Sequence, residues 1–291
     1  MYPASFGYSA PATLDEVLST LSKLGDEGRV LAGGQSLIPL MKLRQAAPAH
    51  LVDINGVGGL DQISDSNGHL EIGALVRHAD VITSEPVSRS VSTMASAAPW
   101  VADPLVRNRG TVVGSVAHCD PKGDWASVML ALDAQVVAKS MAGERTIAMT
   151  DFIVDFFTNS LEPGEMATAL KVPKDVPNSG GTYLKLERKI GDYATVGVAA
   201  FLALDSAGKI ARAGLGLTSV ASLNVKATEA EAMLTGNEPS DELFAEAAES
   251  AARASSPSSD VRGPADYKRE LVRVYTRRAL TGAWAKARGE V

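Results

Sequence analysis

The pattern of secondary-structure signals along this chain changes once, at a segment rich in proline, glycine, asparagine and serine between residues 174 and 181. Before this segment, helix and strand signals alternate. After it, three strand-like stretches follow one another and three helical stretches complete the chain. A polar segment of this composition is typical of a linker, and 291 residues leave room for two domains. We therefore predict an α+β protein with domains over residues 1–176 and 177–291.

The first domain is predicted to contain two α/β subdomains, over residues 1–57 and 58–176. In the first, Thr13 and Glu16 have capping-box spacing before a helical stripe of leucine and valine. Strand signals lie at 29–32, 50–54, 70–74, 135–138, 145–148 and 166–172, and helix signals at 14–24, 36–43, 78–84, 87–98 and 125–132.

The second domain is predicted as a three-stranded antiparallel sheet backed by helices. Its strand signals cover residues 182–188, 195–204 and 210–217, and its helix signals cover 224–234, 241–254 and 265–287.

Composition excludes several classes of function. The 34 acidic residues outnumber the 28 Lys and Arg, which argues against a nucleic-acid-binding role because phosphate contacts need a basic face. The only cysteine, Cys119, cannot by itself complete a disulfide, a four-cysteine zinc site or an iron–sulfur cluster. Neither a signal peptide nor a membrane-spanning stretch is recognisable, so we expect a cytoplasmic protein, compatible with association with the inner face of the membrane.

The sharpest local motif is Ala32-Gly33-Gly34-Gln35-Ser36, which lies between a predicted strand and a predicted short helix. Two glycines let the backbone approach a ligand closely, and successive N–H groups with a serine hydroxyl can bind an anion. A tight strand-to-helix turn explains the same residues. Neither the dinucleotide fingerprint nor the nucleotide P-loop is present here, which argues against a Rossmann enzyme and an NTPase.

A second glycine-containing stretch covers residues 109–115 and leads to Asp120 and Asp124. By itself it is compatible with a bulged strand. Two such stretches in one domain fit one long ligand that contains a diphosphate, and backbone dipoles can bind this group without a basic surface.

Other chemistry-bearing residues have structural explanations beside the functional ones. Cys119 next to His118 could be a nucleophile, but a packed thiol near a ligand is the better interpretation. The four histidines lack metal-ligand spacing. The segment from Lys185 to Tyr193 is either a solvated hairpin or a charged rim whose aromatic ring covers a cofactor.

Taken together, the motifs resemble those of the FAD-binding medium subunits of molybdenum hydroxylases, of the aerobic carbon monoxide dehydrogenase and N-heterocycle dehydrogenase type. The matching segments run in the family's order along nearly the whole chain. They are FGYSAPATLDEV (6–17), AGGQSLIPLMKLR (32–44), LVDIN (51–55), IGALVRHADV (72–81), RNRGTVVGSVAHCDPKGDW (107–125), KLERKIGDYATVGVA (185–199), LTSVA (217–221) and DVRGPADYK (260–268).

The resemblance implies a PCMH-type FAD-binding domain made of the two α/β subdomains, followed by the C-terminal domain of the medium subunit. The residues that it implies in FAD binding are Ala32, Gly33, Gly34, Gln35, Ser36, Leu37, Thr111, Gly114, Ser115, Ala117, His118, Asp120, Asp124, Lys185 and Tyr193. Among them, Asp124 matches an acidic position near the cofactor, Lys185 a basic position at its rim, and Tyr193 a position at the isoalloxazine edge. Val113 departs from the family pattern, which commonly has glycine there, so the local cradle is expected to differ.

The function implied by the resemblance is electron transfer, with neither a catalytic acid or base nor a metal ligand in this chain. Substrate is oxidised at the molybdenum cofactor of a large subunit, and electrons pass through [2Fe–2S] clusters of a small subunit to FAD and an external acceptor. A dimer of heterotrimers is the expected assembly. Carbon monoxide, an N-heterocycle and an aldehyde stay open as substrates. The alternatives are an autonomous flavin oxidoreductase of the same superfold and a non-enzymatic ligand-binding module.

Overall fold

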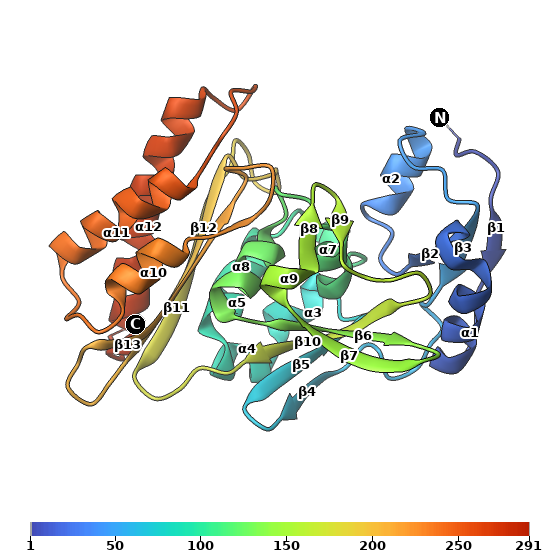
Figure 1. Cartoon of the computed structure of the whole chain (residues 1–291), viewed down its shortest axis with the longest axis horizontal. Coiled ribbons are helices and arrows are strands. Elements are labelled where there is room, and N and C mark those ends of the chain that lie inside the picture. Colours follow the sequence, from blue (N-terminus) through green and yellow to red (C-terminus); the bar gives the residue numbers. More distant parts are fainter. Residues whose placement is uncertain (1, 291) are drawn as a thin grey trace.

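Three main β-sheets follow one another through the computed structural model, which describes residues 2–290 (Figure 1). The first is a parallel sheet of β1 (Gly7–Ser9), β3 (His50–Asp53) and β2 (Gly28–Leu31), in that order. Helices α1 (Leu14–Leu24) and α2 (Leu37–Lys42) belong to this unit. The predicted capping box at the start of α1 is confirmed, because Thr13 and Glu16 exchange both hydrogen bonds.

The second sheet is antiparallel and has five strands. Its order is β4 (Ile63–Ser66), β5 (His69–Gly73), β10 (Met166–Pro173), β6 (Gln135–Ser140) and β7 (Gly143–Ala148). The helices of this part are α3 (His78–Thr83), α4 (Glu85–Ser90), α5 (Ser92–Ala97), α6 (Pro104–Arg107), α7 (Val112–His118), α8 (Asp124–Leu132) and α9 (Met149–Phe152). A small hairpin of β8 (Ile153–Asp155) and β9 (Thr158–Asn159) lies beside α7.

The third sheet contains the three predicted antiparallel strands, β11 (Ser179–Leu186), β12 (Val196–Leu204) and β13 (Ile210–Thr218). A two-residue strand, β14 (Val225–Lys226), extends it where the sequence predicted the start of a helix. Helix α10 therefore begins later, at Thr228, and ends at Leu234. With α11 (Asp241–Ala254) and α12 (Ala265–Ala287), it covers the outer face of this sheet (Figure 1).

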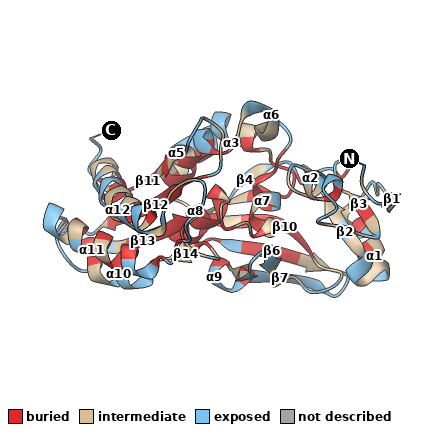
Figure 2. Cartoon of the chain, turned by 90° about the horizontal axis from the view of Figure 1, so that it is seen from above, coloured by how far each residue is buried: buried red, intermediate tan, exposed pale blue. Residues whose placement is uncertain are grey.

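Two hydrophobic cores meet at strand β12, which is buried along almost its whole length (Figure 2). Successive side chains of a strand point to opposite faces. Accordingly, Ala199, Phe201 and Ala203 contribute to the core of the first 180 residues, whereas Val198 and Leu202 belong to the core under the C-terminal helices. Burial on both faces explains why β12 reads as a continuous apolar run instead of an alternating one.

Helix α8 lies against the other face of this sheet, and two glycines of β13 permit a very close approach. A Cβ atom on Gly214 or Gly216 would lie 1.9 Å from the carbonyl oxygen of Ala131 or Ser127, respectively. All nine residues of α8 are buried. The N-terminal and C-terminal halves of the chain are therefore joined by direct backbone packing.

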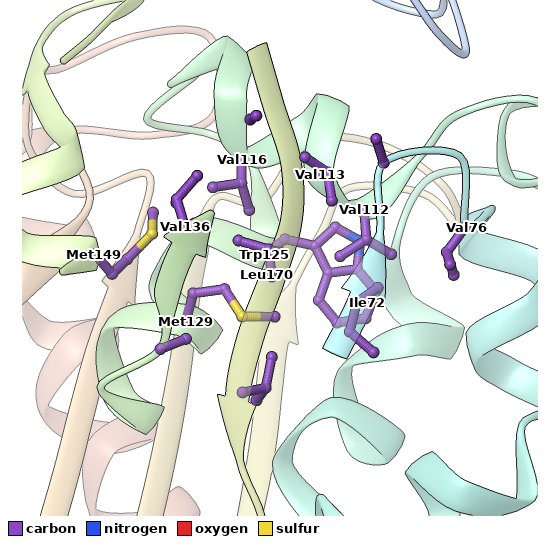
Figure 3. Close-up of a cluster of buried hydrophobic side chains, with 14 of the residues drawn as sticks. Ile72, Val76, Val112, Val113, Val116, Trp125, Met129, Val136, Met149 and Leu170 are labelled. Atoms are coloured by element: carbon purple, nitrogen blue, oxygen red, sulfur yellow. The ribbon is translucent and has the colours of Figure 1, made fainter. Parts of the chain in front are cut away.

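The stretch at 109–116 is not a bulged strand. Thr111 caps a helix, α7, by accepting a hydrogen bond from the Gly114 N–H at 3.1 Å. Val112, Val113 and Val116 of α7 point into the core beside Trp125 (Figure 3). The β-branched residues misled the strand prediction, because burial of this face outweighs local propensity.

Of the helices in residues 2–290, none combines the length and apolar character that crossing a membrane requires.

Candidate functional site

The loop that follows β2 presents a row of unpaired backbone donors. No backbone N–H of residues 33–37 donates a hydrogen bond to an acceptor among residues 2–290. Gly34 has a φ of +71°, a conformation that glycine adopts without strain. The segment is both a strand-to-helix turn and a set of N–H groups that can bind an anion, so the two interpretations of this motif are compatible.

The second glycine-containing stretch lies directly against this loop. A Cβ atom on Gly33 would lie 2.4 Å from the Arg109 carbonyl oxygen and 2.7 Å from the Gly110 Cα atom. Only a residue without a side chain permits this approach. The tertiary structure thus brings together the two stretches that the sequence singled out separately.

The candidate site continues along helix α7, which begins next to the contact between the two loops. Its residues Gly114 and Ser115 lie on the side that is not packed in the core, and Gly114 is exposed. Seven residues of helix span about 10 Å, so the surface from Gly33 to His118 suits an elongated ligand. Val113 is buried in the core (Figure 3) and does not line this surface, so its departure from the family pattern leaves the exposed side of α7 unchanged.

Asp120 and Tyr193 meet at the far end of α7, although 73 residues separate them in the sequence. Burial and the neighbouring Asp120 carboxylate raise the pKa of Tyr193 to about 12. Half of the residue is exposed to solvent, and its hydroxyl keeps its proton at neutral pH, as a tyrosine with an ordinary pKa also does. The ring of His118 packs on Phe157 of the β8–β9 hairpin, with 4.8 Å between the ring centres.

Asp124 and Lys185 lie in the interior and pair with each other, and Glu187 Oε2 lies 3.4 Å from the same ammonium. The Lys185 ammonium donates to Asp124 Oδ2 at 3.0 Å and to the Trp100 carbonyl at 2.9 Å, and the Tyr183 hydroxyl donates to Asp124 Oδ1 at 2.6 Å. Only 1% of the Lys185 side chain is exposed. A solvated hairpin is therefore wrong at Lys185, because its charge is neutralised inside the protein, and its position at the cofactor rim stays a prediction.

Comparison with known proteins follows the same division of the chain. The family model described as FAD binding domain in molybdopterin dehydrogenase matches residues 4–175. The family model described as CO dehydrogenase flavoprotein C-terminal domain matches residues 181–283. The chain belongs to the family of FAD-binding medium subunits of molybdenum hydroxylases. It is an oxidoreductase subunit, and its cofactor is FAD.

Relatives in this medium-subunit family match over almost the full chain. The 6-hydroxypseudooxynicotine dehydrogenase complex subunit alpha of Paenarthrobacter nicotinovorans is 38% identical over 99% of this chain and 97% of the relative. The carbon monoxide dehydrogenase medium chain of Afipia carboxidovorans is 37% identical over 99% of this chain and 100% of the relative. A solved carbon monoxide dehydrogenase from Hydrogenophaga pseudoflava superposes with a TM-score of 0.94 at 38% identity, covering 98% of this chain and 99% of that chain.

Cys119 is a packed thiol. It is 1% exposed, and burial raises its pKa to about 12. A nucleophile needs an accessible thiolate, so the structure supports the packing role.

Sequence reasoning missed Asn55 and Arg77, which connect the two loops of the site. Asn55 follows β3, and the end of β3 pairs in parallel with the end of β2 at Leu31 and Asp53. Residues after neighbouring parallel strands lie at the same edge of a sheet. This signal was available for Asn55, whereas nothing in the local sequence placed Arg77 beside it.

Sequence reasoning also missed His78. Its burial leads us to expect that the stability of the protein depends on pH. Its backbone N–H donates to the Gly110 carbonyl at 3.0 Å, and its Nδ1 accepts from Trp125 Nε1 at 3.0 Å. Burial, together with the nearby Arg107 and Arg77, lowers the pKa of His78 to about 4. The unfolded chain then binds a proton below about pH 6.5 that the folded chain does not accept.

Acidification from pH 7.5 to pH 5 is therefore expected to remove about 2 kcal/mol from the free energy of unfolding through His78 alone. Urea titrations of the wild type and His78→Gln at both pH values measure this contribution. Glutamine can still accept the hydrogen bond from Trp125, and it does not titrate. Equal pH dependence of the two proteins would show that His78 contributes nothing to it.

Proposed function

We propose that this chain is the FAD-carrying electron-transfer subunit of a molybdenum hydroxylase. In this proposal it receives electrons from [2Fe–2S] clusters of a small subunit and passes them to an external acceptor, while a large subunit oxidises carbon monoxide or an N-heterocycle at its molybdenum cofactor. The observation that carries the proposal is the contact between the two glycine-containing loops, with unpaired N–H groups at residues 33–37, in a chain that matches this family end to end.

The predicted cofactor residues have distinct tasks in this proposal. The backbone at residues 32–37 and the outward side of α7 at 111–115 bind the diphosphate and ribityl parts of FAD. Ala117, His118, Asp120 and Tyr193 lie toward the flavin end, where the Tyr193 hydroxyl faces the Asp120 carboxylate. Asp124 and Lys185 act from the interior, where their ion pair connects the start of α8 to β11. FAD supplies the redox chemistry, and this chain positions it and tunes its environment.

The chain's cysteine count supports the division of labour between subunits. A [2Fe–2S] cluster needs several protein ligands, usually four cysteines, and Cys119 is the only cysteine here. The clusters are therefore assigned to a separate chain. We extend this to a dimer of heterotrimers, as the resemblance implies.

Relatives with nearly the same identity to this chain carry the names of different substrates. One belongs to a 6-hydroxypseudooxynicotine dehydrogenase and another to a carbon monoxide dehydrogenase, at 38% and 37% identity. In the proposed complex the substrate binds in the large subunit, so the sequence of this chain is not under direct selection for one substrate. Both substrate classes belong to the proposal for this reason.

Purification of the full chain tests the proposal. We expect one FAD per chain, with a flavin absorption band near ~450 nm, and no oxidation of carbon monoxide or N-heterocycles until the large and small subunits are added. Substrate turnover by the chain alone, with no molybdenum present, would overturn it. Flavin reduction by NAD(P)H with the chain alone would favour the autonomous flavin oxidoreductase.

A further inference from the structure

A hydrogen-bonded chain of four side chains runs along one edge of the candidate site. The Tyr8 hydroxyl donates to Asp53 Oδ2 at 2.8 Å, and Asp53 Oδ1 accepts from Asn55 Nδ2 at 2.6 Å. Asn55 Oδ1 in turn accepts from the Arg77 guanidinium at 2.7 Å. Asn55 belongs to the parallel-sheet unit and Arg77 precedes α3, so this row of hydrogen bonds connects two separately predicted subdomains.

The same two side chains also bond to the backbone of both loops. Asn55 Nδ2 donates to the Ala32 carbonyl at 2.8 Å, and Arg77 Nη1 donates to the Arg109 carbonyl at 2.5 Å. Ala32 precedes Gly33, and Arg109 is the residue whose carbonyl lies against Gly33. Each of the two contacting loops is thus held by one end of the Asn55–Arg77 pair.

The backbone around Arg77 adds to this connection. Arg77 forms an antiparallel bridge with Thr111, and the Val112 N–H donates to the Val76 carbonyl at 3.1 Å. The start of α7 is therefore fixed to Arg77 through its main chain, and the guanidinium extends from this fixed point toward Asn55. Arginine suits such a task because its donors have a rigid, planar geometry.

We propose that Asn55 and Arg77 form a clamp that sets the spacing of the two FAD-binding loops, so that both can bind one diphosphate. This inference rests on the proposed function, and it makes Asn55 and Arg77 positioning residues. The competing explanation is that Arg77 acts only by its positive charge, which would attract the diphosphate from a distance.

A double-mutant cycle on the full chain separates these explanations. The variants are Asn55→Ala, Arg77→Lys and the double variant, and the readout is the Kd for FAD, measured by flavin fluorescence on the apoprotein. We expect each single change to weaken binding by about tenfold or more. The double variant should bind FAD only slightly more weakly than the single variant with the lower affinity, because both changes break the same Asn55–Arg77 pair. If charge alone matters, Arg77→Lys and Asn55→Ala bind FAD like the wild type.

Two control variants report on changes outside the clamp. Arg145 also donates to a carbonyl and a side chain, Ser160 O and Glu165, but it connects elements of one subdomain only. Asn237 donates from its side-chain amide to Met233 O in the C-terminal domain. Arg145→Lys and Asn237→Ala should leave the Kd within about twofold of the wild type.

The outcomes distinguish the clamp from the function on which it rests. Unchanged FAD affinity in the clamp variants, or strictly additive losses, overturns the clamp while the wild type still binds FAD. A lower thermal midpoint of the apoprotein with unchanged Kd assigns the pair a purely structural role and also overturns it. A wild type that does not bind FAD overturns both proposals.

Discussion

Replacement of Lys185 by methionine is expected to lower the free energy of unfolding by about 3–5 kcal/mol. The change removes the cation of a buried pair and leaves the Asp124 carboxylate in the interior with only the Tyr183 hydroxyl as a side-chain donor. Burial already raises the pKa of Asp124, and Lys185 is the strongest influence that opposes this increase. Urea unfolding followed by circular dichroism measures the loss.

Lys139→Met is the matched control for this experiment. Lys139 pairs with Glu144 at 2.9 Å, but 36% of its side chain is exposed, so its loss should cost less than about 1 kcal/mol. The double variant Asp124→Asn/Lys185→Met should recover part of the lost stability, because asparagine carries no charge and still accepts from Tyr183, whereas the Glu187 carboxylate stays without the Lys185 ammonium. If Lys185→Met is no more destabilising than Lys139→Met, the buried pair does not contribute to the stability of the protein.

Replacement of Gly33 by alanine is expected to weaken FAD binding by roughly 5-fold to 150-fold, which corresponds to about 1–3 kcal/mol of overpacking. The added methyl group would lie 2.4 Å from the Arg109 carbonyl oxygen, so the two loops must separate. The Kd for FAD of the apoprotein measures this effect directly.

Gly58→Ala provides the comparison for Gly33→Ala. Gly58 lies in the same domain, has no neighbour within 4 Å of an added Cβ atom, and does not adopt a positive φ. Its substitution should leave the Kd unchanged. Wild-type affinity in Gly33→Ala would mean that the contact between the loops is irrelevant to cofactor binding.

Local signals predicted some elements well and misled at others. Helix α1 was predictable because its capping box and apolar stripe lie within its own residues. Helix α7 was not, because Val112 and Val113 favour a strand locally, and only their burial against distant residues stabilises the helix. The short β14 exists because β13 offers a free edge, which the sequence around Val225 does not reveal.

The candidate site shows the same division. Both glycine-containing stretches could be singled out as candidate ligand loops, since glycine at these positions is a local property. The domain boundary at 176/177 and the roles of the site residues remain predictions. Lys185 was recognised as a residue of interest, but its burial depends on Asp124 and Trp100, which come from other elements.

The sequence by itself determined the class of the protein: two glycine-containing loops, family motifs in order, and a single cysteine, which cannot by itself complete an iron–sulfur cluster. Only the tertiary structure decided that Gly33 lies against Arg109, that Asn55 meets Arg77, and that Asp124 pairs with Lys185. These contacts join residues far apart in the sequence, and their geometry depends on how the sheets and helices pack. Residue types and local spacing do not contain this information.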